Sequence, residues 1–179
     1  MNRPYRLGRR QTSVDRTGHA ILAAARQVVT EAPPGAVSIG AVARRAGVSR
    51  LTVYNRFGSR AGLLQALVPQ PGPAEPEGRD PREALHRRLL DASSAWANDT
   101  SLYRHLPTTE MAEPERDRRL AERLAAADAL RPGCSIKEAE DVIGALASFA
   151  MFDRLHRDGR RSPATVAEML MRLAAGILA

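Results

Sequence analysis

Apolar residues recur at the three- and four-residue spacing of an α-helix along most of the chain, and no segment shows the alternation typical of a β-strand. Near the N-terminus this spacing predicts a helix over residues 13–31, which the Pro33-Pro34-Gly35 sequence ends. Three short helices should follow, because each is preceded by a serine that can cap it: Ser38, Ser49 and Ser59. Their expected ranges are 39–45, 50–55 and a stretch from residue 60.

A proline-rich stretch divides the chain in two. Residues 69–81 contain five prolines and two glycines, and this density of helix breakers predicts a connecting loop. Asp80 and Pro81 then form a capped start for a second series of helices. We expect these from residue 81, over 101–106, up to Pro132, over 136–158 and from Pro163. The chain should therefore be all-α, with about nine helices, a first domain at residues 13–68 and a second at 82–179.

Positive charge is concentrated in the N-terminal part. The chain of 179 residues has a formal net charge of +7. Residues 1–68 contain 11 arginines and two acidic residues, a net charge of +9, whereas the remainder contains 16 basic and 18 acidic residues, a net charge of −2. An excess confined to about a third of the chain favours a polyanionic partner for that part. Residues 1–12 form a basic arm that could reach phosphates or the minor groove of DNA, carrying Arg3, Arg6, Arg9 and Arg10.

The sequence between Pro34 and the proline-rich loop meets the steric demands of a helix-turn-helix. This motif needs a small residue where its two helices touch, a residue that tolerates positive φ in the turn, and a branched apolar residue on the inner face of the second helix. Ala43, Gly47 and Val53 meet these demands at correlated spacing. Residues 13–68 are therefore predicted to be a DNA-binding domain.

The second helix of the motif carries side chains suited to reading DNA. Its first turn should reach deepest into the major groove, which makes Arg50, Leu51 and Thr52 the expected base readers. Alternatively, one or more of them contacts only phosphate. The expected phosphate contacts are hydroxyl, amide and basic side chains: Ser38, Ser49, Tyr54, Asn55 and Arg60.

On these residues the chain resembles the tetracycline-repressor (TetR) family of bacterial transcriptional regulators. The resemblance covers residues 13–68 and is most specific at Ala43, Ala46-Gly47-Val48-Ser49, Thr52-Val53-Tyr54, Phe57 and Leu63-Leu64. It implies that Tyr54 and Arg60 contact the DNA backbone. It also implies a homodimer on a near-palindromic operator, whose binding is weakened by an effector in the second domain. The family usually has lysine where Arg60 stands.

The last two expected helices have more apolar surface than one short subunit readily covers. Two such helices from each of two subunits would form a four-helix dimer interface. An ordinary intramolecular core is the alternative. The residues expected in the interface are Ile143, Leu146, Ala147, Ala150, Val166, Leu170, Leu173 and Ile177.

An effector pocket would lie between about residues 80 and 152, where bulky side chains are available to line it. The candidates are Trp96, Tyr103, His105, Met111, Phe149 and Phe152. Each could instead be a core residue. Because few of them are charged, a small apolar or aromatic effector is expected.

Several chemical functions lack support in the sequence. A single cysteine excludes an internal disulfide, and the four histidines show no metal-binding spacing, so neither a metal nor a cofactor is expected. Cys134 precedes a helix and could be a redox sensor, although a loop cysteine without function is the favoured interpretation. No apolar run approaches the ~20 residues of a membrane span, which favours a cytoplasmic protein.

The sequence thus predicts a sequence-specific DNA-binding regulator rather than an enzyme, since no paired carboxylates, nucleophile elbow or phosphate-binding glycine loop is found. A repressor released by a small molecule is the first hypothesis. A constitutive or activating regulator without an effector is the alternative. An alternative from another functional class is a helical enzyme or binding protein whose basic N-terminus is incidental.

Overall fold

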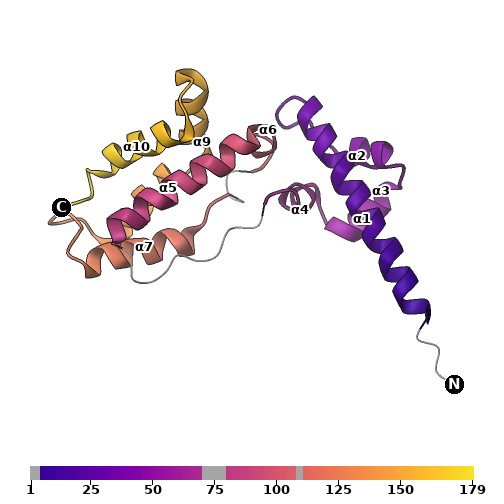
Figure 1. Cartoon of the computed structure of the whole chain (residues 1–179), viewed down its shortest axis with the longest axis horizontal. Helices are drawn as coiled ribbons and strands as arrows, with labels where there is room; N and C mark the ends of the chain where they lie inside the picture. Colours follow the sequence, from indigo (N-terminus) through magenta and orange to yellow (C-terminus); the bar gives the residue numbers. More distant parts are fainter. Residues whose placement is uncertain (1–4, 70–79, 108–110) are drawn as a thin grey trace. The chain divides into compact units, whose positions relative to one another are not determined.

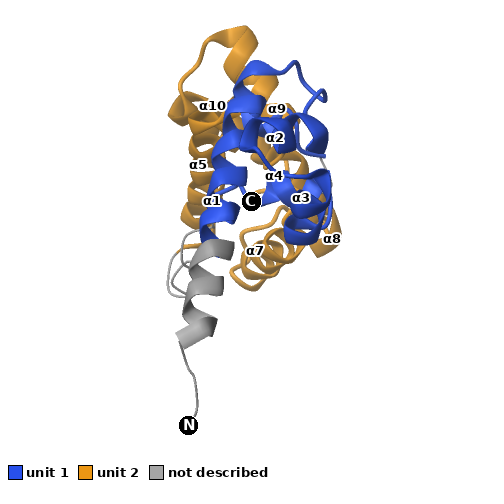
Figure 2. Ribbon diagram, turned by 90° about the vertical axis from the view of Figure 1, so that its right-hand side faces the viewer, with its two compact units in different colours: residues 1–70, 101–107 blue, residues 71–100, 108–179 orange. Residues whose placement is uncertain are grey.

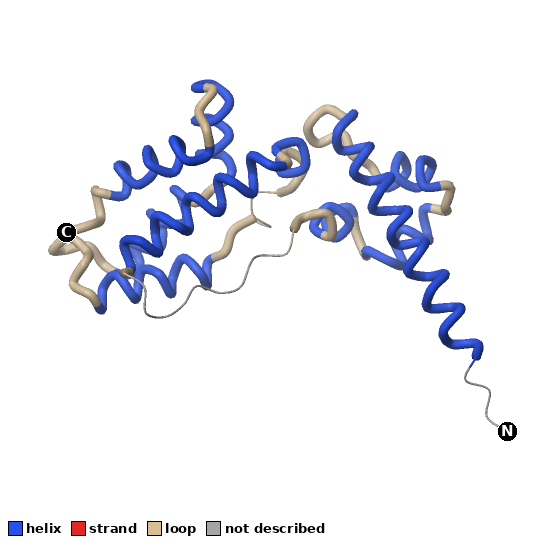
Figure 3. The backbone as a smooth tube through the Cα atoms, in the orientation of Figure 1, coloured by secondary structure: helices blue, strands red, loops and turns tan. Residues whose placement is uncertain are grey.

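The computed structural model describes residues 5–69, 80–107 and 111–179, and the side chains of the first range from Asp15 onward. Within these residues the chain forms ten α-helices and no β-strand, which confirms the all-α prediction (Figure 1, Figure 3). The chain divides into two compact units (Figure 2). Unit 1 comprises residues 1–70 and 101–107, and unit 2 comprises residues 71–100 and 108–179. Most of the predicted proline-rich loop, residues 70–79, lies outside the described residues.

Unit 1 is built on a long first helix. Its helices are α1 (Tyr5–Glu31), α2 (Ile39–Ala46), α3 (Arg50–Phe57), α4 (Arg60–Gln65) and most of α6 (Thr100–Tyr103). Helix α1 begins at Tyr5 rather than at the expected residue 13, and it packs against α2 and α4. Helix α3 contacts α2 and α4, which completes a small apolar core. That core contains Ile21, Val42, Val53, Leu63, Leu64 and Leu67.

Unit 2 is a layered helical bundle. It contains α5 (Pro81–Asn98), α7 (Pro114–Ala126), α8 (Ile136–Leu146), α9 (Phe149–Asp153), a π-helical segment (Arg154–Asp158) and α10 (Pro163–Ala174). Helix α10 packs along α5, and α7 packs along α8. The predicted start of α5 is confirmed, because Asp80 accepts a hydrogen bond from the Arg82 backbone N–H and Pro81 takes the first helical position.

The single helix expected over residues 136–158 is wrong, because the chain breaks between α8 and α9. Ser148 has an extended backbone (φ −100°, ψ 144°) at this break. Its hydroxyl donates to the Ala145 carbonyl at 2.7 Å and accepts from the Met151 backbone N–H at 3.4 Å. One serine therefore satisfies groups on both helix ends, which removes much of the cost of the break.

Helix α7 is also shorter than expected, since it ends at Ala126 rather than near Pro132. Asp128 has a positive φ of 51°, and the chain then pairs with the C-terminal residues. Leu130 and Leu178 form an isolated antiparallel bridge, with Arg131 donating to the Ile177 carbonyl at 2.9 Å. Apolar spacing could not reveal this pairing because the two partners lie far apart in sequence.

Candidate nucleic-acid interface

The turn between α2 and α3 depends on a glycine in the left-handed region. Ser38 caps α2 by accepting from the Ala41 backbone N–H at 3.2 Å. At the other end Gly47 has φ 66° and ψ 30°, and its N–H donates to the Arg44 carbonyl at 3.3 Å. A residue with a Cβ is strained in this conformation, which glycine adopts readily.

Helix α3 starts abruptly after this turn and is fixed by one inward side chain. Ser49 accepts from the Thr52 backbone N–H at 3.0 Å, and the two side-chain oxygens of these residues lie 2.8 Å apart. Val53 is completely buried against the rest of unit 1. Because the cap and Val53 fix the orientation of the helix, the opposite face of α3 is held outward.

The outward face of α3 combines apolar and polar side chains. Leu51 is 66% exposed and Tyr54 is 50% exposed, which is unusual for residues of this size. Arg50 and Asn55 are exposed beside them, whereas Thr52 is half-buried. A helix with this face can offer hydrogen bonds to base edges and an apolar contact to a thymine methyl group.

Two glycines of unit 1 make room for arginines of α3. A Cβ on Gly40 of α2 would meet the guanidinium of Arg50 at 3.0 Å, and a Cβ on Gly18 of α1 would meet that of Arg56 at 2.7 Å. Arg56 also lies 3.5 Å from Asp15. The sequence did not predict these two glycine–arginine contacts, because a glycine inside a helix does not indicate which side chain packs over it.

Two other arginines near the motif, Arg45 and Arg60, are held within unit 1. Arg45 forms two 2.6 Å hydrogen bonds with Glu31, and this bonding lowers the pKa of the Glu31 carboxyl. Arg60 donates from Nε to the Val37 carbonyl at 2.8 Å and from a terminal nitrogen to the His105 carbonyl at 3.0 Å. Its proposed phosphate contact stays a prediction, and it would have to share the guanidinium with these carbonyls.

Residues 21–67 match the family model described as "Bacterial regulatory proteins, tetR family". This segment runs from the middle of α1 through the capped turn to the end of α4. The helix-turn-helix segment is therefore similar to the DNA-binding part of TetR-family regulators.

Individual relatives agree with this family. Over 49 residues the chain is 46% identical to the HTH-type transcriptional regulator AlkX of Mycobacterium tuberculosis, a match that covers 27% of this chain and 23% of AlkX. The matched segment thus spans about a quarter of that relative's length. The structure of NalD, the secondary repressor of the MexAB-OprM multidrug efflux pump in Pseudomonas aeruginosa, is 26% identical with a TM-score of 0.66, covering 93% of this chain and 98% of NalD.

A third likeness supports the fold alone. TylP, a TetR regulator from Streptomyces fradiae, is 20% identical with a TM-score of 0.59, and the match covers 91% of this chain and 87% of TylP. Both structural matches extend over unit 1 and unit 2, so the helical second unit also has the TetR-family architecture.

Three of the six predicted pocket residues form an aromatic cluster in unit 2. The Trp96 ring lies with its centroid 6.1 Å from Phe149 and 5.5 Å from Phe152. All three side chains are buried. Tyr103 and His105 belong instead to unit 1.

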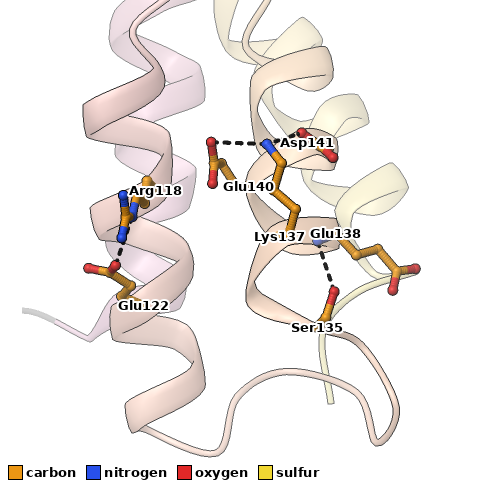
Figure 4. Close-up of polar contacts among 7 residues, drawn as sticks. All are labelled: Arg118, Glu122, Ser135, Lys137, Glu138, Glu140 and Asp141. Atoms are coloured by element: carbon orange, nitrogen blue, oxygen red, sulfur yellow. Dashed lines mark hydrogen bonds and ion pairs between the residues drawn. The ribbon is translucent and has the colours of Figure 1, made fainter.

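A hollow of about 300 Å³ in unit 2 is lined by two of the candidates, Met111 and Phe149. Charged side chains of α7 and α8 share its lining: Asp117, Lys137, Glu140 and Asp141. Figure 4 shows Lys137 reaching Glu140 and Asp141, at 3.2 and 2.8 Å. The hollow is therefore more polar than the sequence suggested.

Asp117, which lines this hollow, is part of a buried ion pair. Arg88 of α5 and Asp117 of α7 are 3% and 4% exposed, with Arg88 Nε 3.2 Å from Asp117 Oδ1. Burial raises the pKa of Asp117, and the neighbouring Arg88 opposes that rise. The pair was not predicted, because its two members lie in different helices.

The predicted dimer residues fall into two groups. Six are buried within the single chain, because α8 packs on α7 and α10 packs on α5: Ile143, Leu146, Ala147, Val166, Leu170 and Ile177. Ala150 is exposed, and Leu173 is 56% exposed. The interface stays a prediction, and the surface available for it is narrower than expected.

Other sequence expectations concern single groups. Burial and Glu138 raise the pKa of the Cys134 thiol, the opposite of what a reactive sensor cysteine requires. Among the described residues, no group of histidine, cysteine and acidic side chains is arranged to hold a metal ion. The described helices include none long and apolar enough to cross a membrane. The side chains of the basic arm, Arg3, Arg6, Arg9 and Arg10, lie outside the described residues.

Proposed function

We propose that this chain is a sequence-specific DNA-binding transcriptional regulator of the TetR family that represses by occupying an operator. The observation that carries the proposal is the face of α3, which exposes Leu51 and Tyr54 on a helix held by a serine cap and a buried valine. Such a face is costly in water unless a partner covers it. The net charge of +9 over residues 1–68 identifies that partner as a polyanion.

Base contacts would come from the first turn of α3. Arg50 would pair with guanine once its guanidinium moves away from Gly40, and Leu51 would contact a thymine methyl group. Thr52 shares a hydrogen bond with Ser49, so its contact with a base would be weaker than that of Arg50.

Phosphate contacts would surround these base readers. The hydroxyls of Ser38 and Ser49 accept backbone N–H groups at the starts of α2 and α3, and both serines are exposed. Helix starts favour anions because their first N–H groups point outward. Tyr54 and Asn55 would donate from the outer side of α3, and Arg60 would contribute charge close to its carbonyl partners.

A homodimer would place two copies of α3 one DNA turn apart, ~34 Å, on a near-palindromic operator. The exposed Leu173 of α10 and Ala150 of α9 are the predicted interface residues that remain free to meet a second subunit. Leucine at this exposure on a C-terminal helix is what a subunit contact would cover.

An effector would bind in the hollow of unit 2. Met111 and Phe149 supply apolar surface there, while Lys137, Glu140 and Asp141 supply charge. The proposed effector is therefore a small molecule with an apolar or aromatic body and a polar end. A regulator without an effector is the second candidate. One observation supports it: Trp96, Phe149 and Phe152, which were expected to line a pocket, pack against one another instead.

A salt titration tests DNA binding. Fluorescence anisotropy with a labelled duplex should give log K falling linearly with log salt, with a slope of several units, because bound cations are released from phosphates. A duplex that is not bound at low salt would contradict the proposal. An effector that binds unit 2 should raise its melting temperature and also lower operator affinity. Ligands that raise the melting temperature without changing operator affinity would favour a regulator without an effector.

A further inference from the structure

Unit 1 includes a segment that the chain contributes from outside the helix-turn-helix sequence. Residues 101–107 belong to unit 1, although the residues before and after them, 71–100 and 108–179, belong to unit 2. In Figure 2 this segment is coloured with unit 1. The DNA-binding unit is thus completed by a segment that is covalently tied to unit 2 at both of its ends.

His105 fastens this segment to the end of α1. The Gly35 backbone N–H donates to His105 Nδ1 at 3.1 Å, and His105 Nε2 lies 3.2 Å from the Val29 carbonyl oxygen. Since Nδ1 accepts a hydrogen bond from the Gly35 N–H, it carries no hydrogen of its own, so the ring is neutral with its hydrogen on Nε2, which donates to the Val29 carbonyl. The residue is 4% exposed, so neither bond is readily replaced by water.

The backbone of His105 extends the contact to α4. Its carbonyl accepts from Arg60, whose Nε also donates to the Val37 carbonyl, one residue before the cap of α2. Arg60 is the first residue of α4. His105 is therefore connected to the end of α1, to the start of α2 and to the start of α4 by direct contacts and through one arginine.

We propose that His105 is a positioning residue for DNA binding: its neutral imidazole closes a clasp, made of His105, Gly35, Val29 and Arg60, that holds α2 and α4 in the binding arrangement. This inference rests on the proposed function. Any change in unit 2 that displaces residues 101–107 would open the clasp, and so would protonation of the ring. Operator affinity should then fall under mild acid, an effect opposite to that of protonating an exposed histidine near DNA.

The surroundings of the ring oppose its protonation. A proton on Nδ1 would face the Gly35 N–H, and the added charge would lie near the Arg60 guanidinium on α4. Burial lowers the pKa of His105 and Arg60 lowers it further, while the backbone groups of Val29 and Ala32 oppose the shift. On its own segment the ring follows Arg104, another cation.

The direction of the pH effect follows from this lowered pKa. The folded, clasped state binds fewer protons than the unfolded state, so its stability is complete above the ordinary histidine pKa of about 6.5 and is lost as the pH falls through the lowered value. On α1, Glu31 cannot neutralise the imidazolium freely because it is paired with Arg45. Acid should therefore weaken the clasp.

Two measurements on the full chain test the clasp. Nitrogen NMR of labelled histidine should show a neutral ring protonated on Nε2 for His105 at neutral pH. Operator affinity, measured on a duplex enriched from a random pool, should fall about tenfold from about pH 8 to about pH 5.5 in the wild type. His105→Asn, which keeps an acceptor near Nδ1 but cannot titrate, should bind with a flat pH profile. His105→Gln is a second non-titrating variant should the first fold poorly.

His19→Gln is the matched control, because His19 is an exposed histidine of α1. It should leave the acid loss intact. Equal pH dependence in the wild type and the His105 variants, or a ring protonated on Nδ1, would overturn the clasp alone. Failure of the wild type to bind any duplex at about pH 8 would instead overturn the proposed function on which the clasp rests.

Discussion

Replacing Gly47 with alanine tests the turn that orients α3. No atom lies within 4 Å of a Cβ built on Gly47, so the substitution causes no clash. The cost is then the backbone conformation alone, φ 66° and ψ 30°, which disfavours an L-residue by about 1–2 kcal/mol. Asparagine should cost less, because it tolerates the left-handed region better than alanine does. Hydrogen exchange of the α2 and α3 amides, followed peptide by peptide, measures the loss in unit 1.

Gly133 supplies a matched control for this prediction. It too has a positive φ, 90°, and open space around its Cβ position, but it lies in unit 2. Gly133→Ala should cost a similar free energy in unit 2, which Trp96 fluorescence reports, and leave exchange in α2 and α3 unchanged. The reasoning is wrong if Gly47→Asn costs as much as Gly47→Ala, or if Gly47→Ala is neutral.

Four further substitutions separate roles that the structure distinguishes. Arg50→Ala should relax sequence preference at one position in each half-site, by about 1–3 kcal/mol. Arg60→Ala should instead weaken binding to all duplexes alike and destabilise unit 1. If both variants behave identically in binding assays, the assignment of Arg50 to bases and Arg60 to phosphates is wrong. Leu173→Glu should yield monomers by sedimentation velocity while preserving helicity, and a surviving dimer would exclude this surface. Arg88→Met should destabilise unit 2 by about 3–5 kcal/mol in urea unfolding, because it leaves Asp117 buried and unpaired. This loss should shrink as the pH falls, since protonated Asp117 carries no charge; a loss that grows in acid would contradict the assignment.

The local features of the helix-turn-helix were predictable from sequence. Ser38, Ser49 and Ser59 each cap the helix expected after them, and Gly47 adopts the left-handed conformation. Caps and turns depend on residues within a few positions of each other, so sequence spacing contains the necessary information. The helices of unit 1 accordingly agree with the predicted ranges to within two residues, apart from α1, which begins at Tyr5 rather than at residue 13, and α6, which ends at Tyr103 rather than at residue 106.

Features that depend on distant residues were not predictable in the same way. Ser148 lies inside the single helix expected over residues 136–158, whereas in the structure it caps a new helix. Periodicity could not reveal this break because apolar spacing continues on both sides. Likewise, Leu146 and Leu170 have the spacing expected of an interface, but each is covered by another helix of the same chain. An apolar stripe on a helix predicts that this face is buried, but it does not predict whether the same chain or a second subunit covers it.

His105 illustrates the same limit at the level of a single side chain. Sequence placed it among bulky candidates for a pocket, and the structure places it in unit 1 with both ring nitrogens engaged. Its partners lie 70 and 76 positions away in the chain. No motif around residue 105 could have named them.

The central claim is that α3 reads the major groove of a specific duplex. Selection from a random-sequence duplex pool, followed by sequencing, tests it most directly. We expect an enriched inverted repeat whose half-site centres lie about 10 base pairs apart, with a guanine preference that Arg50→Ala removes. Enrichment of no sequence at low salt, or of a sequence unaffected by substitutions in α3, would contradict the account.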